Sequence, residues 1–374
     1  MMYDVLIVGG GLAGLVNAVH LSQAGLEVIV LEKNDYPKHK VCGEYISKEV
    51  LPYLESIGIH PFQVGATSID KFTLSSPNGT EISTRLPLGG FGISRFTLDH
   101  LLYQKALSNG CKVVKTTVEK ISFLDNSFKV STRSGIDYLA TFTIGAYGKR
   151  STLDVQLNRK FIHEKTPFLA VKSHFTGDFP DDLVALHNFE GGYCGVSKVE
   201  NGFINICYLA NYKTFKQYRN IETYQQEVLY KNPHLNKIFG TVQNAFPKPL
   251  TISQISFAAK ETVENGIFMC GDAAGMIHPL CGNGMGMAIH SAQILSNLLV
   301  QFFNKKTTNR QSLEAAYIKE WKLTFQKRLR AGHFLNLFLS NANLLNLGIP
   351  ALRLFPKLLP TIIRQTHGEK LSTN

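Results

Sequence analysis

Residues 3–32 read YDVLIVGGGLAGLVNAVHLSQAGLEVIVLE, and this stretch decides the fold class. Residues 3–8 form a short apolar strand, a helical pattern follows to about residue 24, and a second strand covers residues 27–31. Gly9, Gly11 and Gly14 occupy the GxGxxG positions, which permit a tight turn, close backbone approach to a pyrophosphate and close helix–strand packing. The stretch therefore predicts a β-α-β unit that binds a nucleotide.

Glu32 follows the second strand directly. An acid at this position is placed to accept hydrogen bonds from both hydroxyls of an adenosine ribose. The same carboxylate argues against a nucleotide that carries a 2′-phosphate.

A second glycine-rich stretch, residues 271–287, reads GDAAGMIHPLCGNGMGM. An apolar run precedes it and an apolar helical pattern follows it from residue 288 to 300, which predicts strand, acidic turn, loop and helix N-terminus. Asp272 can accept a hydrogen bond from a ribityl or ribose hydroxyl, and free N–H groups at residues 282–285 favour an anionic ring or phosphate. Taken alone, the stretch is equally compatible with a loop that only turns the chain.

Composition predicts a globular protein with one large domain or two interleaved domains, because 374 residues exceed the usual single core and 44% are hydrophobic. The six cysteines are scattered without a CxxC pair, which favours a reducing cytoplasm. We expect no secretion signal, because residues 1–31 lack a basic n-region and carry Asp4, and no transmembrane helix, since no run of eighteen apolar residues occurs. No metal site and no nucleic-acid partner are predicted, and the oligomeric state is left open.

The net charge of +11 is concentrated near the C-terminus. Residues 301–374 carry twelve Lys and Arg against three Glu, a net charge of +9. This region is helical, with a basic amphipathic helix from Leu313 to Leu329, and it is rich in Leu, Ile and Phe from residue 334 to 363. It is either a peripheral surface that lies on an anionic membrane and admits a lipid-like substrate, or a helical cap on the sheet with a basic outer face.

The middle of the chain is mostly β-structure. Residues 69–85 form two strands around a Pro-Asn-Gly turn, residues 112–142 form a three-stranded meander, and residues 161–210 are β-rich. Residues 212–239 are helical and residues 252–257 form a strand. Arg95 near the start of a helix is either a cofactor contact or a solvated side chain. Cys42 in a loop is either a cofactor contact or a small buried side chain.

We therefore predict an α/β fold with a Rossmann-like domain, an inserted, mostly antiparallel sheet and a C-terminal helical segment. The nucleotide-binding domain is discontinuous and takes residues 1–68, 92–160 and 252–300. The substrate-binding sheet domain takes residues 69–91 and 161–251. Residues 301–374 form the basic amphipathic C-terminal region.

Taken together, three motifs resemble one family. They are Gly9-x-Gly11-x-x-Gly14 with Glu32, Arg95-x-x-x-Asp99-x-x-Leu102, and Gly271-Asp272 with Pro279 and Gly282-x-Gly284. The combination is similar to the FAD-dependent oxidoreductases of the p-hydroxybenzoate hydroxylase fold, over roughly the first three hundred residues. The resemblance implies that Arg95 and Asp272 contact FAD and that the helix opening at Gly284 faces the isoalloxazine.

The residues expected to bind FAD are Gly9, Gly11, Leu12, Ala13, Gly14, Glu32, Lys33, Cys42, Arg95, Val118, Gly271, Asp272, Pro279, Gly282, Asn283, Gly284 and Met285. Candidate catalytic residues are Cys42, Tyr193 and His278. Because only one nucleotide-binding β-α-β unit is visible, NAD(P)H is expected as a transient electron donor.

Within the superfamily, the chain resembles the geranylgeranyl reductase-like branch. Gly275 stands where aromatic hydroxylases usually place a His, and Cys42-Gly43-Glu44 is similar to the cysteine-glycine motif that lies near the flavin in those reductases. The chain departs from the wider pattern where Tyr147-Gly148 replaces an Asp-Gly pair. It departs again after Tyr193-Cys194, where Gly195-Val196-Ser197-Lys198 replaces the reductases' Trp-x-Phe-Pro. Trp321 is the only Trp, so the paired-Trp motif of flavin halogenases is absent.

The leading hypothesis is a reductase that saturates a C=C bond of a lipid-like or polyketide-like, hydrophobic small molecule by hydride transfer from reduced flavin. The alternatives are a monooxygenase that uses NAD(P)H and O2, and a non-redox FAD-requiring cyclase or prenyl-binding carrier. The expected location is the cytoplasm, where the protein either attaches peripherally to a membrane or stays free of one.

Overall fold

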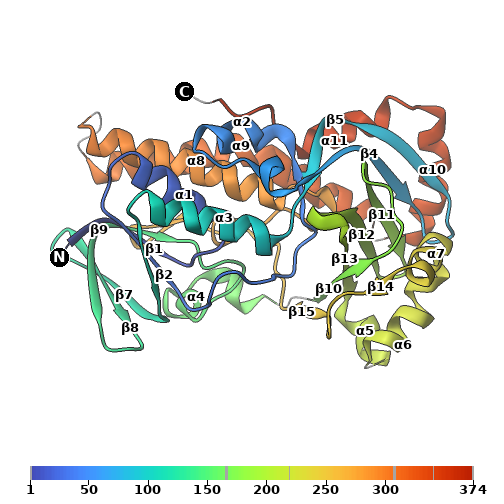
Figure 1. Cartoon of the computed structure of the whole chain (residues 1–374), viewed down its shortest axis with the longest axis horizontal. Helices are drawn as coiled ribbons and strands as arrows, with labels where there is room; N and C mark the ends of the chain where they lie inside the picture. The colour runs from blue at the N-terminus through green and yellow to red at the C-terminus, as the bar shows by residue number, and fades with distance from the viewer. Residues whose placement is uncertain (1, 165–166, 219, 306–308, 340, 373–374) are drawn as a thin grey trace.

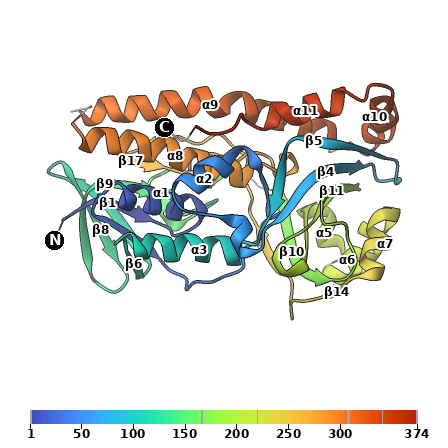
Figure 2. The same cartoon turned by 45° about the horizontal axis from the view of Figure 1, so that its top comes forward.

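The computed structural model describes residues 2–164, 167–218, 220–305, 309–339 and 341–372. Two β-sheets lie side by side, and the last helices run across the top of both (Figures 1 and 2). Of the C-terminal region 301–374, residues 306–308, 340, 373 and 374 lie outside the described residues.

The first sheet has the strand order β16-β17-β9-β1-β2-β6, with β7 and β8 attached to β9. Its parallel strands place Gly9 and Glu32 at one edge, because β1 pairs in parallel with both β2 and β9. The strands are β1 (Met2–Val8), β2 (Val28–Glu32), β6 (Lys112–Lys115), β7 (Val118–Leu124), β8 (Ser127–Thr132), β9 (Asp137–Gly145), β16 (Val263–Glu264) and β17 (Ile267–Met269).

Both faces of this sheet are covered, which explains why β1 and β2 are almost continuously apolar. Val5 and Ile7 point into the main core, together with residues from α1 (Leu12–Gln23), α3 (Arg95–Ser108) and α8 (Gly284–Phe303). Leu6 and Val8 point to the other face, where they share a core with Val118 of β7, Val130 of β8 and Leu153.

The second sheet has the order β14-β10-β13-β12-β11-β4-β5-β3, with β15 paired to β10. Alternate residues of β10–β13 form a separate core against α5 (Tyr212–Tyr218), α6 (Ile221–Glu227) and α7 (Pro233–Thr241), so the opposite face looks toward the first sheet. The strands are β3 (Tyr45–Ser47), β4 (Thr67–Ser75), β5 (Glu81–Gly92), β10 (Phe168–Thr176), β11 (Leu183–Phe189), β12 (Gly192–Lys198), β13 (Ile204–Asn211), β14 (Gln243–Asn244) and β15 (Leu250–Ser253).

Three helices complete the chain: α9 (Arg310–Leu339), α10 (Ala342–Leu354) and α11 (Leu358–Thr366). Helix α9 packs on α8, whereas α10 and α11 lie over β5. The chain end is tied to the nucleotide-binding half, because Leu371 N donates to Glu49 O at 2.8 Å and Gly368 N donates to the Glu49 carboxylate. Short helices α2 (Leu51–Ser56) and α4 (Thr152–Gln156) lie in connections between strands.

The α/β fold with an inserted, mostly antiparallel sheet and a helical C-terminal segment agrees with the sequence prediction. Three details differ. The strand predicted at residues 252–257 is β15 and ends at Ser253, because Gln254 adopts a left-handed φ of 59°. Residues 112–142 hold four strands, since β6 pairs in parallel with β2. The helix predicted from Leu313 to Leu329 extends over the whole of α9.

Candidate functional site

A cavity of about 1170 Å³ lies between the two sheets and the C-terminal helices. It is larger than the roughly 300–1,000 Å³ of common small-molecule pockets, so it has room for a large cofactor and a second molecule. The nucleotide-binding end is lined by the loops after β1, β2, β9 and β17. The other end is lined by apolar side chains of the second sheet and of α9–α11, among them Leu186, Leu209, Leu335, Phe338, Leu359 and Ile363.

The N-terminus of α1 faces the cavity. Gly9 and Gly14 let the start of this helix pack closely against the ends of β1 and β9. A Cβ on Gly14 would lie 2.0 Å from Gly9 O, and a Cβ on Gly9 would lie 2.6 Å from Ala146 O. A Cβ on Gly11, in contrast, would lie 3.8 Å from both Arg95 Nη2 and Lys40 Nζ. The space above Gly11 is therefore bounded by two cations and by a helix N-terminus without a side-chain cap, which suits a pyrophosphate.

Arg95 is positioned by its own helix. Ser94 caps α3, so Arg95 is the first helical residue, and its side chain turns back onto Asp99 one turn later. Arg95 Nε and Nη2 donate to Asp99 Oδ1 and Oδ2 at 2.7 and 2.8 Å, and Lys40 Nζ lies 2.9 Å from Oδ2. Burial alone would raise the pKa of Asp99, but these two cations lower it. The carboxylate is therefore ionised and holds both cations at the cavity.

Glu32 is fixed at the end of β2. Its Oε2 accepts from Gly10 N at 2.8 Å, and its Oε1 accepts from Asn34 N at 2.9 Å and from Asn34 Nδ2 at 2.5 Å. The carboxylate is 8% exposed and lines the cavity. Asn34 uses both lone pairs of Oε1, whereas Oε2 accepts one bond and retains a lone pair for a ligand hydroxyl. Leu12, Ala13, Lys33 and Val118 line the same end of the cavity.

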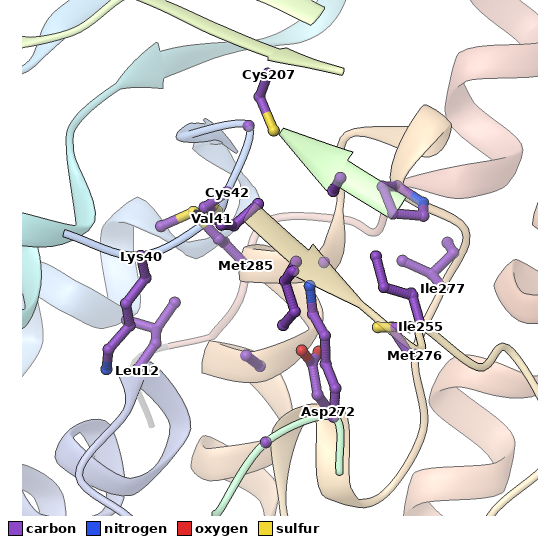
Figure 3. Close-up of a pocket in the computed structure, with 18 of the residues that line it drawn as sticks. Leu12, Lys40, Val41, Cys42, Cys207, Ile255, Asp272, Met276, Ile277 and Met285 are labelled. Atoms are coloured by element: carbon purple, nitrogen blue, oxygen red, sulfur yellow. Dashed lines mark hydrogen bonds between the residues drawn. The ribbon is translucent and has the colours of Figure 1, made fainter. Parts of the chain in front are cut away.

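Two basic side chains hold the backbone of the loop around Asp272. Lys260 Nζ donates to Asp272 O at 2.7 Å, and Arg159 Nη1 donates to Ala273 O at 3.0 Å while pairing with Asp154 at 2.9 Å. Burial lowers the pKa of Lys260 to about 8. Because the loop is held through its carbonyls, the Asp272 side chain is left to face the cavity (Figure 3).

Helix α8 begins at the cavity with free N–H groups. Asn283 stands at its N-cap but makes no side-chain cap, since Asn283 Nδ2 donates to Thr366 O at 2.8 Å. A Cβ on Gly284 would meet nothing within 4 Å, so open space lies in front of the helix. Cys42 Sγ lies 3.3 Å from Met285 Sδ at this point (Figure 3). Gly271, Pro279, Gly282 and Gly284 also line the cavity.

The three candidate catalytic residues are placed differently. Cys42 and Tyr193 line the cavity. The Tyr193 hydroxyl is buried without a hydrogen-bond partner, and burial raises its pKa well above the ordinary value. His278 is not among the described residues that line the cavity. Its ring packs 4.4 Å from the Phe257 ring, and burial lowers its pKa to about 3, so it is neutral.

Sequence reasoning missed several charged residues of the site. Lys40 lies two residues before Cys42 of the cysteine-glycine motif, and no role is assigned to it from the sequence. Glu44 is fully buried and accepts from Lys172 Nζ and His174 Nε2, each at 2.6 Å, while its Oε1 also accepts from Arg95 N at 2.8 Å. The available signal was a Lys and a His at alternate positions of the apolar strand β10, where both point to the same face.

Tyr147, which stands where the superfamily pattern has an Asp, also lines the cavity. Its hydroxyl lies 3.3 Å from Met269 Sδ, and burial raises its pKa. A neutral phenol therefore replaces a carboxylate at the cavity wall.

Comparison with known proteins identifies related chains. A protein family described as "FAD binding domain" matches residues 2–327. The conditioned medium factor receptor 1 of Dictyostelium discoideum is 25% identical over 372 residues, covering 90% of this chain and 71% of its own length. A digeranylgeranylglycerophospholipid reductase of Methanoculleus marisnigri is 23% identical over 338 residues, covering 86% of this chain and 82% of its own length.

Solved structures with the same fold include a halogenase and a protein from P. aeruginosa. Halogenase PltM, in complex with phloroglucinol and FAD, has a TM-score of 0.75 at 19% identity and covers 92% of this chain and 78% of its own. PqsL of P. aeruginosa, in complex with 2-aminobenzoylacetate, has a TM-score of 0.77 at 16% identity. The match covers 93% of this chain and 99% of PqsL. At these identities the likeness shows the fold, in agreement with the sequence prediction.

Proposed function

This chain belongs to the FAD binding domain family and is an FAD-dependent oxidoreductase, and we propose that it reduces C=C bonds of a lipid-like substrate. The observation that carries the proposal is the continuity of the cavity, which joins the nucleotide-binding end to a wall of apolar side chains from the sheet and from α9–α11. Its similarity to a digeranylgeranylglycerophospholipid reductase supports the same substrate class.

The residues of the cavity fit FAD. Gly11, Arg95 and Lys40 would hold the pyrophosphate, Glu32 the adenosine ribose and Asp272 a ribityl hydroxyl. The free N–H groups at the start of α8 would stabilise negative charge on the ring system. FAD, when bound, supplies the hydride-transfer chemistry.

The remaining steps belong to the chain's own side chains. The net reaction consumes one NAD(P)H and one proton per C=C bond and yields the saturated bond and NAD(P)⁺. The Tyr193 hydroxyl, neutral and without a protein partner, is the proposed proton donor at the cavity wall, and it regains its proton from water. Cys42 Sγ donates to Met285 Sδ beside the helix N-terminus, and these two side chains would exclude water there. NAD(P)H would bind transiently, because one nucleotide-binding β-α-β unit is present in the described part of the chain.

Anaerobic turnover tests this proposal. Protein loaded with FAD and reduced with NADPH or dithionite is mixed with a digeranylgeranylglycerophospholipid, and the product is analysed by mass spectrometry. The expected result is a gain of two hydrogens per double bond without oxygen. Product formation that requires O2 and carries an oxygen atom would instead identify a monooxygenase, and a changed carbon skeleton without net reduction would identify a cyclase. Binding without any conversion would leave a prenyl-binding carrier.

A membrane surface at the C-terminus would deliver such a substrate. From residue 334 onward, seven large apolar residues of α9–α11 and their connection are exposed, and we call them the C-terminal apolar surface: Phe334, Leu337, Leu344, Leu347, Leu354, Phe355 and Leu358. Helix α10 also buries Leu345 and Ile349 on its inner side, so it is apolar on both faces. Exposed Arg330, Lys357 and Arg364 lie on the same elements.

We infer that this surface lies on an anionic membrane, because apolar side chains beside basic ones match the interface of such a bilayer. Inner residues of the same helices, Leu352 and Ile362, line the cavity, so a lipid would have a short path into the site. Within the described ranges, no helix is both long and apolar enough to span a membrane. The six cysteines are free, which supports a reducing cytoplasm as the compartment.

A further inference from the structure

The wall of the cavity formed by the second sheet has a missing side chain at its centre. Register and alternation place Leu186 of β11, Gly195 of β12 and Cys207 of β13 side by side on the face that looks into the cavity. Along β12 the same face carries Tyr193 before Gly195 and Ser197 after it. All five residues line the cavity. Gly195 therefore leaves a recess with side chains on four sides.

The fold does not require a glycine at this position. A Cβ on Gly195 would meet only Cys207 O, at an ordinary contact distance of 3.6 Å. Gly192, at the start of the same strand, differs, because its Cβ would lie 2.2 Å from Leu209 O. A glycine inside a strand weakens the strand and often marks the close approach of a ligand. The recess is therefore better explained by a bound molecule than by packing.

The recess is bordered by polar atoms that have no protein partner. Ser197 is 1% exposed and its Oγ is buried without a hydrogen bond. Asn205, the register partner of Ser197 on β13, is fully buried, and its Oδ1 is likewise unpartnered while its Nδ2 donates to Gly43 O at 2.8 Å. Such groups are normally satisfied in a folded protein. A donor and an acceptor thus remain available beside the recess.

Charge near the recess is already neutralised. Lys172 lies on the same face one strand beyond Cys207, but its Nζ is bound to the Glu44 carboxylate at 2.6 Å. His174, further along β10, is bound to the other oxygen of that carboxylate. An ionic group in the recess would therefore lose its hydration without gaining an ion pair.

We propose that Gly195 is a specificity-determining residue, and that its recess receives an uncharged, oxygen-bearing group of the substrate, such as a hydroxyl or an ester carbonyl, hydrogen-bonded to Ser197 Oγ. This inference rests on the proposed function for the lipid-like nature of the rest of the substrate. The recess would orient an amphiphilic molecule with its oxygen at the sheet and its chain toward α9–α11.

The test compares two ligands that differ in the oxygen. Farnesol and the hydrocarbon farnesene are titrated into FAD-loaded protein, and binding is followed by calorimetry and by the flavin absorbance difference spectrum, without turnover. Wild-type protein should bind farnesol roughly tenfold more tightly than farnesene, the difference expected for one hydrogen bond to a buried hydroxyl. Ser197→Ala should abolish that preference. Gly195→Leu should weaken both ligands by roughly tenfold or more, because it fills the recess.

The matched controls are Gly195→Ala and Gly240→Ala. Gly240 is at an exposed position of α7 with open space around it. Gly195→Ala should weaken binding less than Gly195→Leu, and Gly240→Ala should have no effect. FAD uptake should stay unchanged in all variants. The inference is overturned if wild-type protein does not prefer farnesol, if Ser197→Ala keeps the preference, or if Gly195→Leu binds both ligands normally. A failure to reduce lipid double bonds, with these binding results intact, would reject the proposed reaction alone.

Discussion

Arg95 and Asp99 form a two-bond ion pair, with Nε–Oδ1 at 2.7 Å and Nη2–Oδ2 at 2.8 Å, on consecutive turns of α3. Asp99 is 1% exposed, so the pair is screened from solvent on the carboxylate side, while Arg95 Nη2 faces the space above Gly11. Because Lys40 shares the same carboxylate, a single buried acid holds both cations at the position proposed for the pyrophosphate.

Asp99→Asn should weaken FAD binding by roughly tenfold to a hundredfold, since a neutral amide cannot accept two charge-assisted bonds and hold both cations. The dissociation constant is measured by quenching of flavin fluorescence on titration into apoprotein. Glu119→Gln is the matched control, because it breaks an Arg–carboxylate pair in which both side chains are at least half exposed. Equal FAD affinity for Asp99→Asn and wild type would contradict this role for Asp99.

Lys172→Met should lower the free energy of unfolding by about 3–5 kcal/mol, because it leaves the Glu44 carboxylate buried with one partner fewer. Chemical denaturation at neutral pH measures the change. Lys71→Met removes an exposed pair with Asp182 and should change stability by less than about 1 kcal/mol. If the two variants lose the same amount, the buried cluster is not a stability determinant.

The same cluster predicts acid sensitivity. Burial alone would raise the pKa of Glu44, but hydrogen bonds and charges from His174 and Lys172 lower it below its ordinary value of 4.5. A carboxyl whose pKa is lower in the folded state contributes stability above its unfolded pKa and loses it as the pH falls. The stability advantage of wild type over Glu44→Gln should therefore be constant near neutrality and shrink below about pH 4.5. Urea denaturation at successive pH values measures it, and an advantage that grows on acidification would reverse the assignment.

Two glycines of β12 should respond to alanine in opposite directions. Gly195→Ala should raise the free energy of unfolding by up to about 0.5–1 kcal/mol, since a Cβ fits there and the unfolded chain loses freedom. Gly192→Ala should lower it by more than about 1 kcal/mol, because its Cβ would collide with Leu209 O. Thermal and urea unfolding of the two variants provide the comparison. A loss of stability in Gly195→Ala would indicate that packing, rather than a ligand, selects glycine.

The predictable parts of the molecule are those in which neighbours in sequence are neighbours in space. Gly9, Gly14 and Glu32 belong to one short β-α-β unit, so their spacing alone indicates their geometry. For Arg95 and Asp272 the local sequence leaves both a cofactor contact and a role without a cofactor open, and only the resemblance to a family favours the cofactor contact. Both line the cavity.

The rest depends on pairings between distant segments. Glu44 meets Lys172 and His174 across about 130 residues, and Glu49 binds Gly368 N and Leu371 N near the chain end. The surroundings of a loop side chain are equally hard to predict from sequence, and the His278 ring packs against Phe257 rather than lining the cavity. The recess at Gly195 cannot be predicted from sequence, because it depends on the strand register that places Leu186 and Cys207 beside this residue.

The C-terminal apolar surface yields a prediction about membranes. The double variant Leu347→Ser/Leu354→Ser should bind vesicles of phosphatidylcholine with phosphatidylserine at least roughly tenfold more weakly than wild type, because each Leu would bury apolar area in the bilayer interface. Leu323→Ser is the control, since Leu323 is 66% exposed on α9 but lies eleven residues before Phe334.

Point variants are preferable to truncation, which would also remove Leu359 from the cavity wall and the hydrogen bond from Leu371 N to Glu49 O. Binding should fall with added salt and with pure phosphatidylcholine, because exposed Lys357 and Arg364 contribute through charge. Unchanged binding by the double variant in a vesicle sedimentation assay would assign these leucines to another partner.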